Sequence, residues 1–90
     1  MAHVQFTRNL KRFFPDLEPV EIQSDTVSDL VRELDVRHPH LASYIVDDRG
    51  ALRRHVNIFV NERMIQDRET LSDALSTDAK VFIVQALSGG

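Results

Sequence analysis

The chain has 90 residues, a formal net charge of −3 and no cysteine. A chain of this length suits one small domain with a single modest core, without room for a deep cleft between two lobes. The absence of cysteine excludes disulfides, a cysteine nucleophile and thiolate metal sites. Net negative charge with scattered Lys and Arg disfavours nucleic acid as a partner, because polyanion binders usually carry a basic face.

The first residues contain no continuous apolar stretch of the kind that a secretory signal needs. No run approaches the roughly 18 apolar residues of a membrane span. The sequence therefore predicts a cytoplasmic protein with no membrane partner.

The first quarter of the chain predicts a β-hairpin. Residues 3–7 alternate in polarity, with Val4 and Phe6 on one face, and predict a strand. Residues 8–19 carry two prolines and predict a turn or loop. Residues 20–23 alternate again and predict the returning strand.

A helix is predicted next, because apolar residues recur at i, i+3, i+4 and i+7. Thr26 and Asp29 have the spacing of a capping box at its start, and Pro39 limits its end. Residues 40–50 predict an irregular or short helical connection. The apolar stripe of the helix consists of Val27, Leu30, Val31 and Leu34.

The second half predicts three more strands. Residues 52–61 alternate most clearly and predict a strand with Val56, Ile58 and Val60 on one face. Residues 62–66 follow a tight turn and predict a short strand, and residues 69–79 predict a compact loop or one helical turn. Residues 80–87 predict the last strand, in which Val81 and Ile83 oppose Phe82 and Val84.

One amphipathic helix must bury its stripe against one face of a sheet. The order of elements therefore predicts an α+β protein of the β-grasp (ubiquitin-like) type. We expect a mixed sheet of four to five strands with one main helix across one face. Residues 1–86 are expected to form this domain, and residues 87–90 a flexible C-terminal tail.

No group of residues forms a convincing catalytic or metal site. His38 and His40 flank a proline, but zinc needs three or four ligands and no other Cys or His lies nearby. His55 is expected in mid-strand, on the face opposite the core. Two carboxylate pairs fall in turn-like segments and are expected to be solvated: Asp16 with Glu18, and Asp47 with Asp48. We therefore predict no catalytic residues and no metal.

Two other features point outward from the predicted core. Phe59, Phe82 and Val84 should gather on the uncovered face of neighbouring strands, where apolar residues usually mark a partner surface. The chain ends in Gly89 and Gly90, directly after a strand. Without a Cβ, such an end can thread a narrow channel and present an unhindered carboxylate, although most chain ends have no role.

These residues resemble the ThiS/MoaD family of ubiquitin-like sulfur carriers. The resemblance is carried by HVNIFVN (55–61), the turn around Leu71 and Leu75, and KVFIVQALSGG (80–90). The extra length between residues 38 and 54 is closer to the MoaD-like members.

The resemblance implies a carrier rather than an enzyme. An E1-like adenylyltransferase would use ATP-Mg to adenylate the Gly90 carboxylate, and a sulfur donor would convert it to a thiocarboxylate. Leu87, Ser88 and Gly89 would pass into the partner's channel. A downstream synthase would then accept the sulfur for molybdopterin, cysteine, thiamine or a similar product.

Two alternatives remain open from the sequence. The chain could be a ubiquitin-like modifier joined to protein lysines, or a β-grasp interaction module with an inert end. The sequence also leaves open the pathway, the sulfur donor, the oligomeric state, and whether the Gly-Gly end is nascent or processed.

Overall fold

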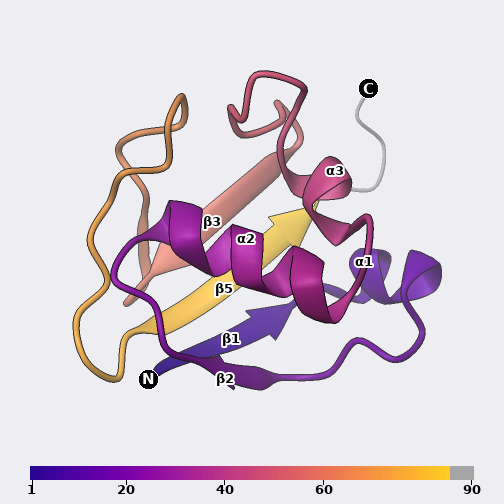
Figure 1. The fold of residues 1–90 in the computed structure, drawn as a ribbon, viewed down its shortest axis with the longest axis horizontal. Coiled ribbons are helices and arrows are strands. Elements are labelled where there is room, and N and C mark those ends of the chain that lie inside the picture. The colour runs from indigo at the N-terminus through magenta and orange to yellow at the C-terminus, as the bar shows by residue number, and fades with distance from the viewer. Residues whose placement is uncertain (86–90) are drawn as a thin grey trace.

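A computed structural model describes residues 1–85 of the chain (Figure 1). The elements in these residues are β1 (Ala2–Phe6), α1 (Arg8–Phe13), β2 (Val20–Ile22), α2 (Val27–Arg37), α3 (Leu41–Ile45), β3 (Val56–Val60), β4 (Arg63–Met64) and β5 (Lys80–Gln85).

The five strands form one mixed sheet in the order β2-β1-β5-β3-β4. The last strand in the chain, β5, lies at the centre. It runs parallel to β1, with Phe6 beside Ile83, and antiparallel to β3, with Ile58 beside Ile83. Figure 1 shows α2 crossing one face of this sheet. The predicted β-grasp architecture is therefore confirmed, with five strands.

Helix α2 begins where the sequence predicts and buries the predicted stripe. Leu30 and Leu34 have no exposed surface, and Val31 is 5% exposed. The Thr26 side chain accepts a hydrogen bond from the Asp29 backbone N–H at 3.2 Å, which satisfies one of the free donors at the helix start. None of the helices in residues 1–85 is long and apolar enough to cross a membrane.

The strands alternate as expected between a buried and a less buried face. In β5, Val81 and Ile83 are buried whereas Lys80 and Phe82 are exposed. This period of two is the physical signature of a strand with one face against a core. The core-facing strand residues pack with those of the helices and loops in one apolar cluster.

The prediction of a loop over residues 8–19 is wrong for its first half, which forms α1. Leu10 is fully buried and anchors this helix to the core. Leu10, Phe13 and Phe14 do have the helical i, i+3, i+4 spacing, but Pro15 and Pro19 favoured a turn or loop in the prediction. Pro15 lies just beyond its end, where a proline is expected.

The strand predicted over residues 52–61 is shorter than expected, because β3 begins at Val56. The Val56 backbone N–H donates to the Arg53 carbonyl at 3.0 Å, which closes a turn directly before the strand. His55 therefore lies in this turn and not in mid-strand, which corrects its predicted place.

The remaining connections match their predictions more closely. Asn61 and Glu62 both have positive φ values, of 50° and 72°, in the turn between β3 and β4, as a tight hairpin requires. Residues 69–79 contain no helix, so the compact-loop prediction holds, and Leu71 and Leu75 bury their side chains in the core.

Candidate functional site

The face of the sheet opposite α2 carries the row of apolar side chains predicted from the sequence. Pairing of β3 with β5 places Phe59 directly beside Phe82, and Asn57 beside Val84. Cross-strand neighbours at such positions lie roughly 5 Å apart between their Cβ atoms. The register therefore confirms that Phe59, Phe82 and Val84 share one face.

The structure adds one residue that the sequence did not suggest. Met64 on β4 pairs with Phe59, and its side chain is 58% exposed. Phe82, at the centre of the row, is 41% exposed. We call the four residues Phe59, Met64, Phe82 and Val84 the open-face patch.

A hollow of about 530 Å³ lies over part of this patch. Phe59 and Phe82 supply its apolar side chains, Val81 borders it from β5, and four polar or charged residues complete the lining: His3, Gln5, Glu62 and Lys80. An apolar centre with a polar rim is the usual anatomy of a protein–protein interface. The face is thus suited to a protein partner.

The end of β5 is the second candidate feature, since it leads toward the Gly-Gly end of the sequence. The Gln85 backbone N–H donates to Thr7 Oγ1 at 3.1 Å. The Asn9 side chain donates to the Gln85 carbonyl at 2.8 Å. The predicted functional tail, Leu87, Ser88, Gly89 and Gly90, lies outside the residues that the structure describes.

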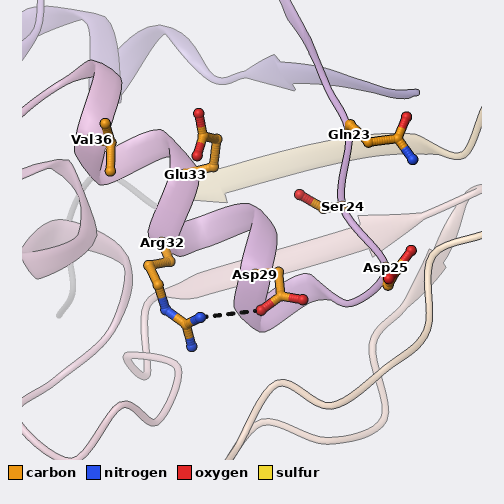
Figure 2. A pocket seen from close by; sticks show the side chains of 7 residues that line it. All are labelled: Gln23, Ser24, Asp25, Asp29, Arg32, Glu33 and Val36. Atoms are coloured by element: carbon orange, nitrogen blue, oxygen red, sulfur yellow. Dashed lines mark hydrogen bonds and ion pairs between the residues drawn. The ribbon is translucent and has the colours of Figure 1, made fainter.

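A different hollow, of about 380 Å³, lies between α2 and the segment before it. The Arg32 side chain donates to Asp29 Oδ1 at 3.3 Å. Figure 2 shows this pair, with Glu33 and Val36 further along the same helix. No group of three or more His, Asp or Glu residues within residues 1–85 is placed to hold a metal ion. This hollow is a solvated acidic surface on the helix.

The other polar candidates are separated in the fold. The His38 backbone N–H closes the end of α2 on the Leu34 carbonyl, and His40 adopts a left-handed φ of 79° before α3. Backbone N–H groups of Arg49 and Ala51 hold the pKa of the Asp47 carboxyl below its ordinary value. An acid shifted in this direction stays ionised near neutral pH, so Asp47 is unsuited to be a general acid.

Comparisons with solved structures give the same fold. One chain of the BexX/CysO complex from Amycolatopsis orientalis matches with a TM-score of 0.84 at 20% identity, covering 100% of both chains. CysO of Mycobacterium tuberculosis matches with 0.83 at 22% identity, covering 97% of this chain and 100% of that one. Small archaeal modifier protein 1 of Haloferax volcanii matches with 0.76 at 24% identity, over 99% and 98%.

Among curated protein sequences, no match was found. A family model described as the ThiS family matches residues 4–90. The match includes the β5 strand, the open-face patch and the Gly-Gly end. Because it spans nearly the entire sequence, the chain belongs to the ThiS family.

Proposed function

We propose that this chain is a sulfur carrier whose Gly90 carboxylate is the reacting group. The observation that carries the proposal is the family match itself, since it runs through Gly89 and Gly90. Members of this family are small carriers that work with E1-like activating enzymes and sulfur-transfer enzymes. A carrier needs a presentable end group and a docking surface, rather than catalytic residues of its own.

The chemistry takes place in two balanced steps. The Gly90 carboxylate attacks the α-phosphorus of ATP in the partner's active site, which releases pyrophosphate and forms an acyl-adenylate. Sulfide, or its equivalent from a donor, then attacks the acyl carbon and displaces AMP. The product is a thiocarboxylate that a downstream enzyme can use as a sulfur source.

The open-face patch is the proposed docking surface for the activating enzyme. Its large apolar side chains are the type that contributes most binding energy when an interface excludes water. Charged neighbours at the rim, such as Glu62 and Lys80, would add orientation and selectivity. Docking through this face would leave residues 87–90 available to enter the partner's channel.

The test is to incubate the full chain with ATP-Mg, sulfide and an E1-like adenylyltransferase, and to measure its intact mass. Replacement of one carboxylate oxygen by sulfur adds about 16 Da. Gly89→Ala and Gly90→Ala should remain folded but lose most of this product, because a Cβ restricts the backbone in a narrow channel. Absence of pyrophosphate release with the unchanged chain would refute the proposal, and wild-type rates for both variants would remove the role of the glycines.

A second candidate is a protein modifier, favoured by the similarity to the archaeal modifier protein. The same adenylate would then be attacked by a lysine amine, so that the chain becomes joined through an amide bond. Conjugates of higher mass that resist thiol reagents would support this outcome. If neither product forms and no pyrophosphate is released, an interaction module with an inert end is the better description.

A further inference from the structure

Hydrogen bonds between the β1 segment and β5 continue beyond the last residue of β1, where side chains take the place of the backbone. The last regular bond runs from the Thr7 N–H to the Ile83 carbonyl, at 3.1 Å. In an uninterrupted parallel ladder, the next bonds would run from Gln85 N–H to the Thr7 carbonyl and from Asn9 N–H to the Gln85 carbonyl. Instead, the chain turns into α1 at Arg8.

Side chains of the same two residues replace both missing bonds. Thr7 Oγ1 accepts from the Gln85 N–H at 3.1 Å, and Asn9 Nδ2 donates to the Gln85 carbonyl at 2.8 Å. Both side-chain contacts are partly buried. The Thr7 carbonyl is occupied elsewhere, because it accepts from the Leu10 N–H at 3.2 Å within α1.

The hydrogen bond of the Thr7 hydroxyl to β5 is informative, because a threonine at this position normally caps the helix that follows. Thr7 is the N-cap residue of α1, where a hydroxyl usually accepts a hydrogen bond from the first turn of the helix. Here it makes no such capping bond. The hydroxyl stabilises the end of β5 in preference to the start of its own helix.

We propose that Thr7 and Asn9 are positioning residues for the reaction at Gly90. They hold Gln85 at a fixed place and so set the point from which residues 86–90 reach into a partner enzyme; this inference rests on the proposed function. Five residues span at most about 17 Å when fully extended. A change of starting point by one residue, roughly 3.3 Å, is therefore about a fifth of the available reach.

Reactions of bound groups are sensitive to such displacements, since a misplacement of about 1 Å can lower a rate by two orders of magnitude. Opening the two side-chain bonds would leave Gln85 beside Val56 of β3 without a backbone hydrogen bond to that strand, because both backbone groups of Gln85 face β1. The carboxylate would then be aligned less often, although docking through the open-face patch would be unchanged.

The first experiment measures amide hydrogen exchange by NMR in the full chain. In a Thr7→Val/Asn9→Leu variant, we expect Gln85 to exchange about tenfold faster or more relative to Ile58, as the loss of two hydrogen bonds predicts. Thr26→Val is the matched control, because it removes one threonine hydrogen bond at the start of α2. Thr7→Ser, which keeps the acceptor oxygen, should stay close to the unchanged chain. An unchanged Gln85-to-Ile58 ratio in the double variant would overturn the inference.

The second experiment measures pyrophosphate release with an E1-like adenylyltransferase that activates the unchanged chain. The double variant should show kcat lowered about tenfold with nearly the same KM, because alignment and not docking is impaired. Thr7→Ser, which keeps the acceptor oxygen, should have nearly the kcat of the unchanged chain. A general loss of stability would instead raise the apparent KM and leave kcat unchanged, because fewer carrier molecules would be folded.

A duplicated Ala86 supplies the sharper comparison. It should lower kcat strongly in the unchanged chain but add little in the double variant, whose starting point is already loose. The positioning role would be wrong if the double variant and the Ala86 duplication lowered kcat additively, or if the double variant had the same kcat as Thr26→Val. Neither result would contradict the proposed function. Failure of the unchanged chain to be activated would instead contradict the proposed function, while the exchange experiment would still decide whether Thr7 and Asn9 hold Gln85.

Discussion

Phe82 has the most central place in the open-face patch, with Phe59 on one side and Gln5 on the other. We expect Phe82→Asp to weaken binding to the activating enzyme by about tenfold or more, since it puts an unpaired charge at the centre of an interface. The melting temperature should change little, because the side chain already faces solvent.

Val36→Asp is the matched control for this prediction. It introduces the same charge at another exposed apolar position, 70% exposed on α2. A binding titration should give an unchanged affinity for this variant. Equal affinities for both variants and the unchanged chain would remove the patch from the docking model.

The Asp67 side chain holds the loop after β4 together through hydrogen bonds. Its carboxylate accepts from the hydroxyls of Ser72 and Thr70 and from the Thr70 backbone N–H, and these bonds lower its pKa well below the ordinary 3.8. A carboxyl with a lowered pKa in the folded state contributes stability above the unfolded value, and this contribution is lost as the pH falls below it.

We therefore expect Asp67→Asn to lower the melting temperature at pH 7, with the difference shrinking as the pH falls below about 4. Glu69→Gln, in the same loop, should have little effect. Thermal melts from pH 2 to pH 7 would test this, and a difference that grows on acidification would contradict it.

Residue positions were predictable where a strand was long enough to show its period. Alternation in β5 was sufficient to place Phe82 and Val84 opposite the core. Met64 was missed because β4 has two residues and no period of its own. Thr7 and Asn9 were missed because their bonds to Gln85 join residues 78 and 76 positions apart, and no local pattern reports such a contact.

Among the elements, α2 contributes most clearly to stability, because its buried stripe packs against the sheet. We expect Leu34→Ala to lower the free energy of unfolding by about 3 kcal/mol, as is typical for truncation of a fully buried leucine. Val36→Ala, on the exposed side of the same helix, should change it by less than about 0.5 kcal/mol. Urea denaturation of both variants tests which side of the helix faces the sheet. Similar losses in the free energy of unfolding for both variants would contradict this orientation of the helix.

Long elements with a clear apolar period were predicted more closely than short ones. The eleven residues of α2 repeat their apolar positions over several turns, and so the helix was predicted closely. The six residues of α1 hold one fully buried side chain, Leu10, and a second apolar residue, Phe13, three positions later, so the helical pattern repeats only once within the helix. Extension of β3 back to residue 52 failed because Leu52 is apolar and buried by the loop, where it meets Val46 in an isolated bridge.

At the scale of the whole molecule, the described core consists of residues that precede the proposed reacting end in the sequence. The buried apolar residues that the structure describes all precede Gln85. We expect deletion of residues 89–90 to leave the melting temperature unchanged and to abolish pyrophosphate release. A large fall in melting temperature would show that the end contributes to folding.

The shortened chain should also compete with the full chain for the activating enzyme, since its docking face is intact. Adding Phe82→Asp to the deletion should remove this competition. Inhibition assays with both shortened chains would thus separate docking from chemistry. Equal inhibition by both would contradict the assignment of docking to the open-face patch.

The two outer strands of the sheet limit how another chain can recognise this one. The three residues of β2 and the two of β4 form both borders, and each carries a charged side chain, Glu21 and Arg63. Such short, charged borders give little template for an added strand. Edge-to-edge association of copies of this chain is therefore disfavoured, and we expect a partner to bind side chains on the face of the sheet rather than to extend the sheet.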